Sequence, residues 1–94
     1  MAKRVRILCN GYANNEISLR FFIKQKAQTL GLKGYCRINE NNLLEIEVEG
    51  KEISIDEFVR FVQKGTRDEK ASNLFSIEMF DHFKGYEKME MDIV

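Results

Sequence analysis

The chain has 94 residues, of which 44% are hydrophobic and 32% are charged. This length and composition fit one globular domain with a single core, so we predict a single domain over residues 1–94. Fifteen basic residues balance fifteen acidic residues, and without a net charge neither nucleic acid nor an anionic membrane is an expected partner. The apolar run that follows the basic N-terminus, Ile7-Leu8-Cys9, is too short for a signal peptide or a membrane span. We therefore expect a cytoplasmic protein.

Two cysteines and one histidine limit the metal and thiol chemistry that the chain can support. Cys9 and Cys36 lie in predicted strands without CxxC spacing, and the usual interpretation is a small buried hydrophobe, with a reactive or bridged thiol as the alternative. His82 lies in a predicted connection between strands and has no second ligand or nucleophile near it in the sequence, so we interpret it as a solvated loop residue. We expect no metal site and no cofactor.

The N-terminal third of the chain predicts a strand followed by a helix. Over residues 3–10 apolar residues alternate with Arg4 and Arg6, which is typical of a strand with one buried face. The next predicted element is a helix over about residues 19–30, ended by Gly31 in a left-handed C-terminal cap. Its predicted buried stripe consists of Leu19, Phe22, Ile23, Ala27 and Leu30.

A hairpin is predicted in the middle of the chain. The run Asn39-Glu40-Asn41-Asn42 is a strong turn signal, and it joins a strand over residues 34–39 to a strand over residues 43–49. In the second of these strands apolar residues alternate with glutamates, which are predicted to face outward. The outward residues are Glu45, Glu47 and Glu49.

The C-terminal half predicts a second helix and two more strands. Ser54-Ile55-Asp56-Glu57 matches a capping box, with Ile53 and Phe58 as the hydrophobic staple around it. The predicted strands span about residues 74–80 and 86–93. The buried stripe of the second helix is predicted to be Ile55, Phe58, Val59 and Val62.

The order βαββαβ, followed by a C-terminal strand, predicts an α+β fold of the ferredoxin-like class. In this α/β sandwich two helices pack on one face of a mainly antiparallel sheet. The other face is predicted to carry Arg4 and Arg6 beside Glu45 and Glu47, as cross-strand pairs on a solvated surface, each worth less than about 1 kcal/mol. The fold alone assigns no function, because many functions share it.

Arg20 lies where a strand and a polar loop lead into a helix. The backbone N–H groups of such a loop and the N-terminus of the helix attract negative charge, and a guanidinium can donate to two oxygens at once. A solvated arginine at the start of a helix is the alternative. We expect the ligand to be a small phosphorylated molecule or another small anion.

The sequence around Arg20 resembles the acylphosphatase family, whose signature is G-x-V-Q-G-V-x-F-R, then a helix with a Leu-Gly end, then G-W-V-x-N. Gly11 opens the loop and Arg20 closes it, and Leu30-Gly31 and Gly34-Tyr35-Cys36-Arg37 follow in the spacing of the family. The resemblance covers nearly the whole chain. It implies a small ferredoxin-like enzyme that hydrolyses the carboxyl–phosphate bond of acyl phosphates without a metal or an organic cofactor.

The resemblance also implies a phosphate-binding loop and a catalytic pair. The phosphate-binding residues that it implies are Tyr12, Asn14, Asn15, Glu16, Ile17, Ser18 and Arg20. In the family a strand asparagine positions the attacking water, and here its position, eighteen residues after Arg20, is Ile38. Asn39 is the neighbouring candidate, and we predict Arg20 and Asn39 as the catalytic residues. Successive strand residues face opposite sides of a sheet, so Asn39 would need a bulge or a register change to take this place.

The loop and the second strand depart from the family pattern in two ways. The segment from Gly11 to Arg20 is one residue longer, and Glu16 replaces the second glycine, which adds a carboxylate where phosphate is expected. Ile38 cannot orient a water, and losing such a group costs about 10²-fold or more in rate. The predicted activity is therefore acyl phosphate hydrolysis that is weak or lost.

The alternative function is a non-catalytic module that binds an anion or another protein on the acylphosphatase fold. Self-association through an exposed sheet edge is a further alternative, for which the sequence gives no strong sign, and we expect a monomer. RNA binding through the open face of the sheet is not expected, because that face would need aromatic residues and an excess of basic charge.

Overall fold

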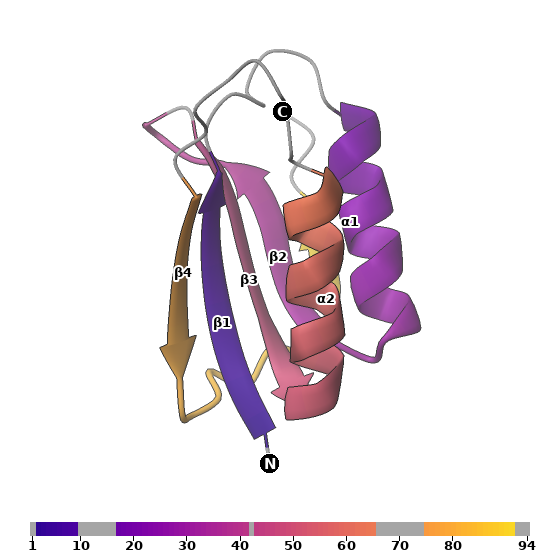
Figure 1. The fold of residues 1–94 in the computed structure, drawn as a ribbon, viewed down its shortest axis with the longest axis vertical. Helices are drawn as coiled ribbons and strands as arrows, with labels where there is room; N and C mark the ends of the chain where they lie inside the picture. The colour runs from indigo at the N-terminus through magenta and orange to yellow at the C-terminus, as the bar shows by residue number, and fades with distance from the viewer. Residues whose placement is uncertain (1, 10–16, 42, 66–74, 92–94) are drawn as a thin grey trace.

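Seven elements follow one another along the chain: β1 (Ala2–Cys9), α1 (Ile17–Thr29), β2 (Lys33–Ile38), β3 (Leu44–Lys51), α2 (Glu52–Gly65), β4 (Phe75–Phe80) and β5 (Met89–Met91). The structure is a computed structural model that describes residues 2–9, 17–41, 43–65 and 75–91. The strands form one sheet in the order β4-β1-β3-β2-β5, and both helices cover the same face of it (Figure 1). Neighbouring strands are antiparallel except β2 and β5. The predicted ferredoxin-like sandwich with a C-terminal strand is confirmed.

The core lies between the sheet and the two helices. β1 places Val5, Ile7 and Cys9 there, all fully buried, as the alternation of its sequence predicts. α2 packs over β1 and β3, and α1 packs over β2 and β5. Cys36 on β2 is equally buried, and neither cysteine forms a disulfide, so both are small buried hydrophobes. In the described part of the chain no helix is long and apolar enough to span a bilayer.

Helix α1 turns a different face to the core from the one that its apolar residues suggest. Ile23 and Ala27 are fully buried, as predicted, whereas Phe22 is 55% exposed, so its predicted place in the buried stripe is wrong. Arg20 takes the inward position one turn before Ile23, at the spacing that puts side chains on one face of a helix. The helix ends as expected at Gly31, which has a φ of 72° and donates its N–H to the carbonyl of Gln28.

β2 and β3 form the predicted hairpin, in which Cys36 lies opposite Ile46. Gly34 lies where β3 approaches most closely, because a Cβ there would be 1.8 Å from the backbone oxygen of Glu47. Only glycine fits at this position. The N–H of Gly34 donates to the carbonyl of Lys88 at 3.0 Å, which fixes the start of β2 beside β5.

Helix α2 begins two residues earlier than its sequence signal. The chain passes directly from β3 into the helix at Glu52, whose carboxylate suits a helix N-terminus and lies 3.3 Å from the Lys3 ammonium. Ser54 is therefore inside the helix, and the predicted capping box is wrong. The hydrophobic staple is wrong too, since Ile53 is 76% exposed. The predicted stripe is confirmed: Ile55, Phe58 and Val62 are buried and Val59 is partly buried.

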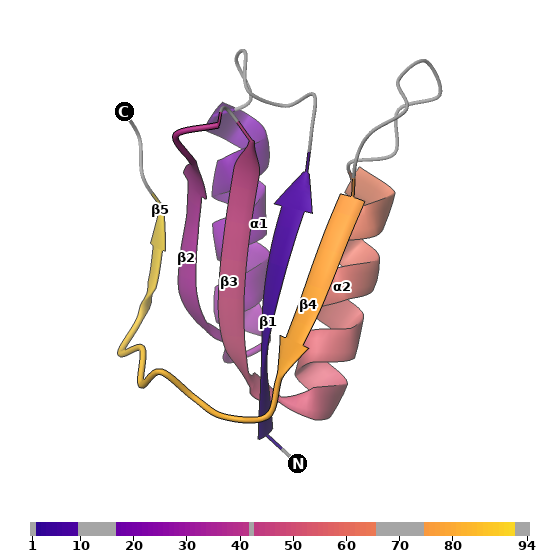
Figure 2. The ribbon, with the colours of Figure 1, turned by 90° about the vertical axis from the view of Figure 1, so that its left-hand side faces the viewer.

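Residues 81–88, the crossing segment, run from β4 across the open face of the sheet to β5 (Figure 2). Glu49 accepts hydrogen bonds from the backbone N–H groups of Lys84, Gly85 and Tyr86 at 2.8–3.1 Å. These N–H groups are therefore not available to a strand, which explains why β5 begins at Met89 rather than at residue 86.

The crossing segment also overturns the prediction of a solvated open face. Glu47 is 0% exposed and Arg4 is 3% exposed, and their side chains form an ion pair at 3.0 Å. The backbone oxygen of His82 accepts from the Nε of Arg4 at 3.2 Å, and the Tyr86 hydroxyl donates to Glu47. His82 itself is exposed. Arg4 and Glu47 therefore form a buried pair and not a surface pair, whereas Arg6 and Glu45 stay partly exposed.

Candidate anion-binding site

The start of α1 lies at the end of the sheet where β1 and β2 both finish. β1 and β2 are each antiparallel to β3, so they run in the same direction, and α1 follows β1 after a short connection (Figure 1). The first N–H groups of a helix have no partner within it and carry the positive end of the helix dipole. This end of the molecule is therefore suited to hold an anion.

Arg20 lies in the first turn of α1 and points into the molecule. It is 7% exposed, which contradicts the alternative of a solvated arginine. Its Nε is buried and has no hydrogen-bond partner among the described residues. A buried donor without an acceptor costs roughly 1–3 kcal/mol, and more when it is charged. Such an arrangement is expected where a ligand supplies the acceptor.

The positive charge of Arg20 acts on Cys36, a buried residue of β2. Burial raises the pKa of its thiol to about 12, while the positive charge of Arg20 lowers that pKa. The guanidinium therefore acts on the face of β2 that is turned toward α1. A thiol with this pKa is protonated and unreactive at neutral pH, so Cys36 supplies no nucleophile. The sequence motif gave no indication of this interaction, because the sequence identifies Cys36 only as a residue of a buried strand.

Ile38, at the end of β2, lies on the same side of the sheet as Cys36. It is opposite the buried Leu44 in β3, and it is partly buried against the core. A hydrocarbon side chain therefore stands on the α1 side of the strand at the position where the resemblance expects an amide. It can exclude water, but it can neither donate to nor accept from one.

Asn39 lies on the other side of the sheet. Its Oδ1 accepts the N–H groups of Asn41 at 2.9 Å and Leu43 at 3.0 Å, and its Nδ2 donates to Glu45 at 3.3 Å. These bonds close the turn between β2 and β3. The catalytic assignment of Asn39 stays a prediction, and it would require the amide to leave all three partners and cross the strand.

The loop part of the predicted site is described only in part. Tyr12, Asn14, Asn15 and Glu16 lie outside the described residues. Ile17 and Ser18 form the first turn of α1, so their backbone N–H groups belong to the helix N-terminus. Of the predicted site residues, Ile17, Ser18 and Arg20 therefore lie together in the first turn of α1.

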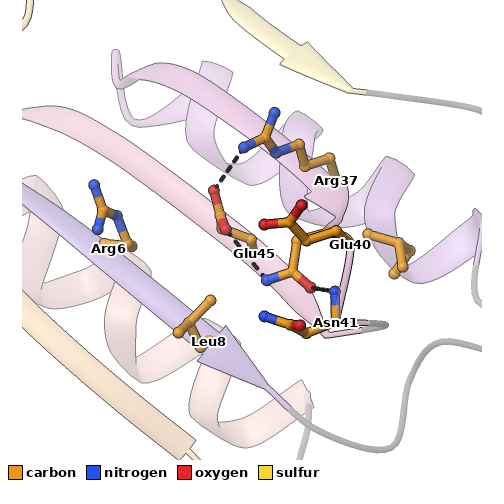
Figure 3. A pocket seen from close by; sticks show the side chains of 8 residues that line it. Arg6, Leu8, Arg37, Glu40, Asn41 and Glu45 are labelled. Atoms are coloured by element: carbon orange, nitrogen blue, oxygen red, sulfur yellow. Dashed lines mark hydrogen bonds and ion pairs between the residues drawn. The ribbon is translucent and has the colours of Figure 1, made fainter.

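A second polar region lies on the open face, across the sheet from Arg20. It is a hollow of about 450 Å³ whose lining includes Arg6, Leu8, Arg37 and Glu45, and these side chains surround the turn end of the hairpin (Figure 3). Its central carboxylate, Glu45, is already bonded to Arg37 at 3.1 Å and to the Tyr35 hydroxyl. Because these charges satisfy one another, the hollow is a weaker candidate for an anion than the start of α1.

Comparisons with known proteins identify relatives of this chain. A family model described as acylphosphatase matches residues 7–84. An acylphosphatase of Caldanaerobacter subterraneus subsp. tengcongensis is 32% identical over 74 residues, which is 79% of this chain and 81% of that protein. One of Bacillus licheniformis is 27% identical over 86 residues, 92% of this chain and 93% of that protein. The crystal structure of acylphosphatase from Bacillus subtilis aligns with a TM-score of 0.80 over 97% of this chain and 99% of that chain, at 22% identity. The chain belongs to the acylphosphatase family.

Proposed function

We propose that the protein binds phosphate and acyl phosphates at the start of α1, and that it hydrolyses the carboxyl–phosphate bond slowly or not at all. One observation carries the binding part: Arg20 is 7% exposed, and its Nε has no acceptor among the described residues. Phosphate oxygens are acceptors that match the geometry of a guanidinium and accept two N–H groups at once.

The binding site that we propose is completed by the loop before α1. The phosphate accepts from Arg20 on one side and from backbone N–H groups on the other, which the predicted loop residues supply. These residues are Tyr12, Asn14, Asn15, Glu16, Ile17 and Ser18. Binding through N–H groups and one guanidinium leaves the acyl end of the ligand free to project out of the site.

Hydrolysis needs a water aimed at the carbonyl carbon, and Ile38 is the reason that we expect it to be slow. Of the residues on the α1 side of β2, Cys36 is a protonated thiol and Ile38 is a hydrocarbon. The amide that follows on the chain, Asn39, is bonded on the opposite side of the sheet. Among the described residues, bound acyl phosphate therefore meets positive charge but no group that orients a nucleophile.

The second candidate function is a module that binds an anion or another protein without catalysis, and the same isoleucine favours it. The two functions differ only in turnover. A protein that binds phosphate and has no turnover above buffer supports the non-catalytic module, whereas measurable turnover that phosphate inhibits supports a slow enzyme.

Replacing Ile38 by asparagine is expected to raise the rate of benzoyl phosphate hydrolysis by about 10²-fold, because it restores a water-orienting amide on the α1 side of β2. The measurement is a timed assay of the native chain, Ile38→Asn and Ile38→Val. Valine keeps a hydrocarbon at this position and is expected to leave the native rate unchanged. Native turnover as fast as that of an efficient acylphosphatase would refute the proposed defect.

A further inference from the structure

The two edges of the sheet are protected to different degrees. β5 forms one edge and, within the described residues, is three residues long. β4 forms the other edge with six residues, Phe75–Phe80, and its sequence contains neither lysine nor proline. Edge strands present unpaired N–H and C=O groups, and natural proteins usually guard them by short length, lysine, proline or a bulge. β4 lacks the first three of these guards.

The side chains of β4 place apolar surface along this edge. Ile77 and Met79 lie opposite Ile7 and Val5, so they face the helical layer. They are nevertheless 36% and 47% exposed, because α2 packs over β1 and β3 and leaves the edge strand at the rim. Glu78 points to the opposite face, where its carboxylate lies 3.9 Å from Arg6.

We propose that β4 pairs antiparallel with β4 of a second copy of this chain, joining two sheets into one. A strand edge is complementary to itself when a two-fold axis relates the copies, since each N–H then meets a C=O of the partner. The formal net charge of the chain is zero, so no long-range repulsion keeps the copies apart. This pairing replaces the monomer that the sequence led us to expect.

The charge on Glu78 selects the register of the pairing. A two-fold axis at Glu78 would put two carboxylates directly opposite each other, which is unfavourable. An axis at Met79 would pair only residues 78–80 within the bounds of β4. An axis at Ile77 pairs residues 75–79, places Ile77 opposite its own copy, and places Glu78 opposite Ser76. The geometry therefore favours the axis at Ile77.

This register makes a specific cross-linking prediction. Residues directly opposite each other in an antiparallel pair have Cα atoms roughly 4.5 or 5.5 Å apart, a separation that a disulfide spans. Ile77→Cys is expected to form a covalent dimer under mild oxidation, and Met79→Cys is expected to remain monomeric, because residue 79 faces residue 75 of the other copy. The native Cys9 and Cys36 are fully buried and do not compete.

Light scattering on the full chain tests the association without cross-linking. The mass of the native protein is expected to rise from 11.0 kDa toward twice that value with concentration. Ile77→Lys, which places two ammonium groups at the axis, should abolish this rise. Phe21→Lys, which changes an equally apolar and exposed residue on α1, should leave it unchanged. The proposal is overturned by a native mass that stays at one chain up to about millimolar concentration, where even small, weak interfaces are populated. It is also overturned by Met79→Cys cross-linking as readily as Ile77→Cys.

Discussion

Arg20→Met is expected to abolish phosphate binding and, at the same time, to stabilise the folded protein. Arg20 is 7% exposed, and its Nε has no acceptor among the described residues. Methionine keeps a long unbranched stem but removes the buried donor that has no acceptor, which should raise the free energy of unfolding by about 1–3 kcal/mol in the absence of phosphate. Losing two charge-assisted hydrogen bonds should weaken phosphate binding by about 10²-fold or more.

Two measurements separate a binding arginine from a structural one. Urea denaturation without phosphate gives the stability of each variant, and the increase in that stability on adding inorganic phosphate gives the binding. Arg60→Met, which removes an exposed arginine of α2, is the matched control and should change neither quantity appreciably. If Arg20→Met lowers stability without phosphate, Arg20 is a structural residue and the proposed binding site loses its main support.

Arg20 also shows where the sequence pattern was insufficient for the site. Apolar spacing assigned Phe22 to the buried face of α1, because it treats every charged residue as exposed. The structure buries Arg20 and leaves Phe22 55% exposed, which reverses this assignment. The family motif singled out the arginine, since it records chemistry and not hydrophobicity, and the binding role of Arg20 stays a prediction. The motif could not indicate that the charge of the guanidinium acts on Cys36, because that interaction arises from the packing of α1 on β2.

The fold was more predictable than the environment of its open face. Alternation in β1 and β3 and the apolar stripe of α2 depend on local geometry, so the sequence predicts them well. Alternation also assigned Glu47 to the open face correctly. It did not predict that the crossing segment covers this face, because residues 81–88 have no periodic pattern. Local signals therefore predicted the elements, while long-range contacts determined which charges are buried.

Glu47→Gln is expected to destabilise the protein by about 3–5 kcal/mol, the cost typical of breaking a buried ion pair. Glu47 is 0% exposed, and its carboxylate accepts from Arg4 at 3.0 Å, Arg6 at 2.9 Å and the Tyr86 hydroxyl. Glutamine has the same shape, but its amide nitrogen would face one of these donors and leave it without an acceptor. Arg4 would also lose the negative charge that compensates its burial.

Denaturation in urea at neutral pH measures this effect, and Glu57→Gln provides the control. The Glu57 side chain is 50% exposed and pairs with Lys26 of α1 at 3.2 Å, so its loss should cost less than about 1 kcal/mol. A Glu47→Gln protein within about 1 kcal/mol of the native stability would show that the buried network is not a main source of stability.

The pH dependence of the same two proteins isolates the charge of Glu47. Burial raises its pKa, but hydrogen bonds from Tyr86, Arg6 and Arg4 outweigh this and lower the pKa from 4.5 to about 2. Since the folded-state pKa is below the unfolded one, the carboxylate stabilises the native state fully above about pH 4.5. This contribution is lost progressively as the pH falls toward 2. The stability difference between the native protein and Glu47→Gln should therefore be constant near neutral pH and shrink between these two values. A difference that does not change with pH would mean that glutamine disturbs the packing of the network, and that the ionisation of Glu47 contributes little to holding the crossing segment on the sheet.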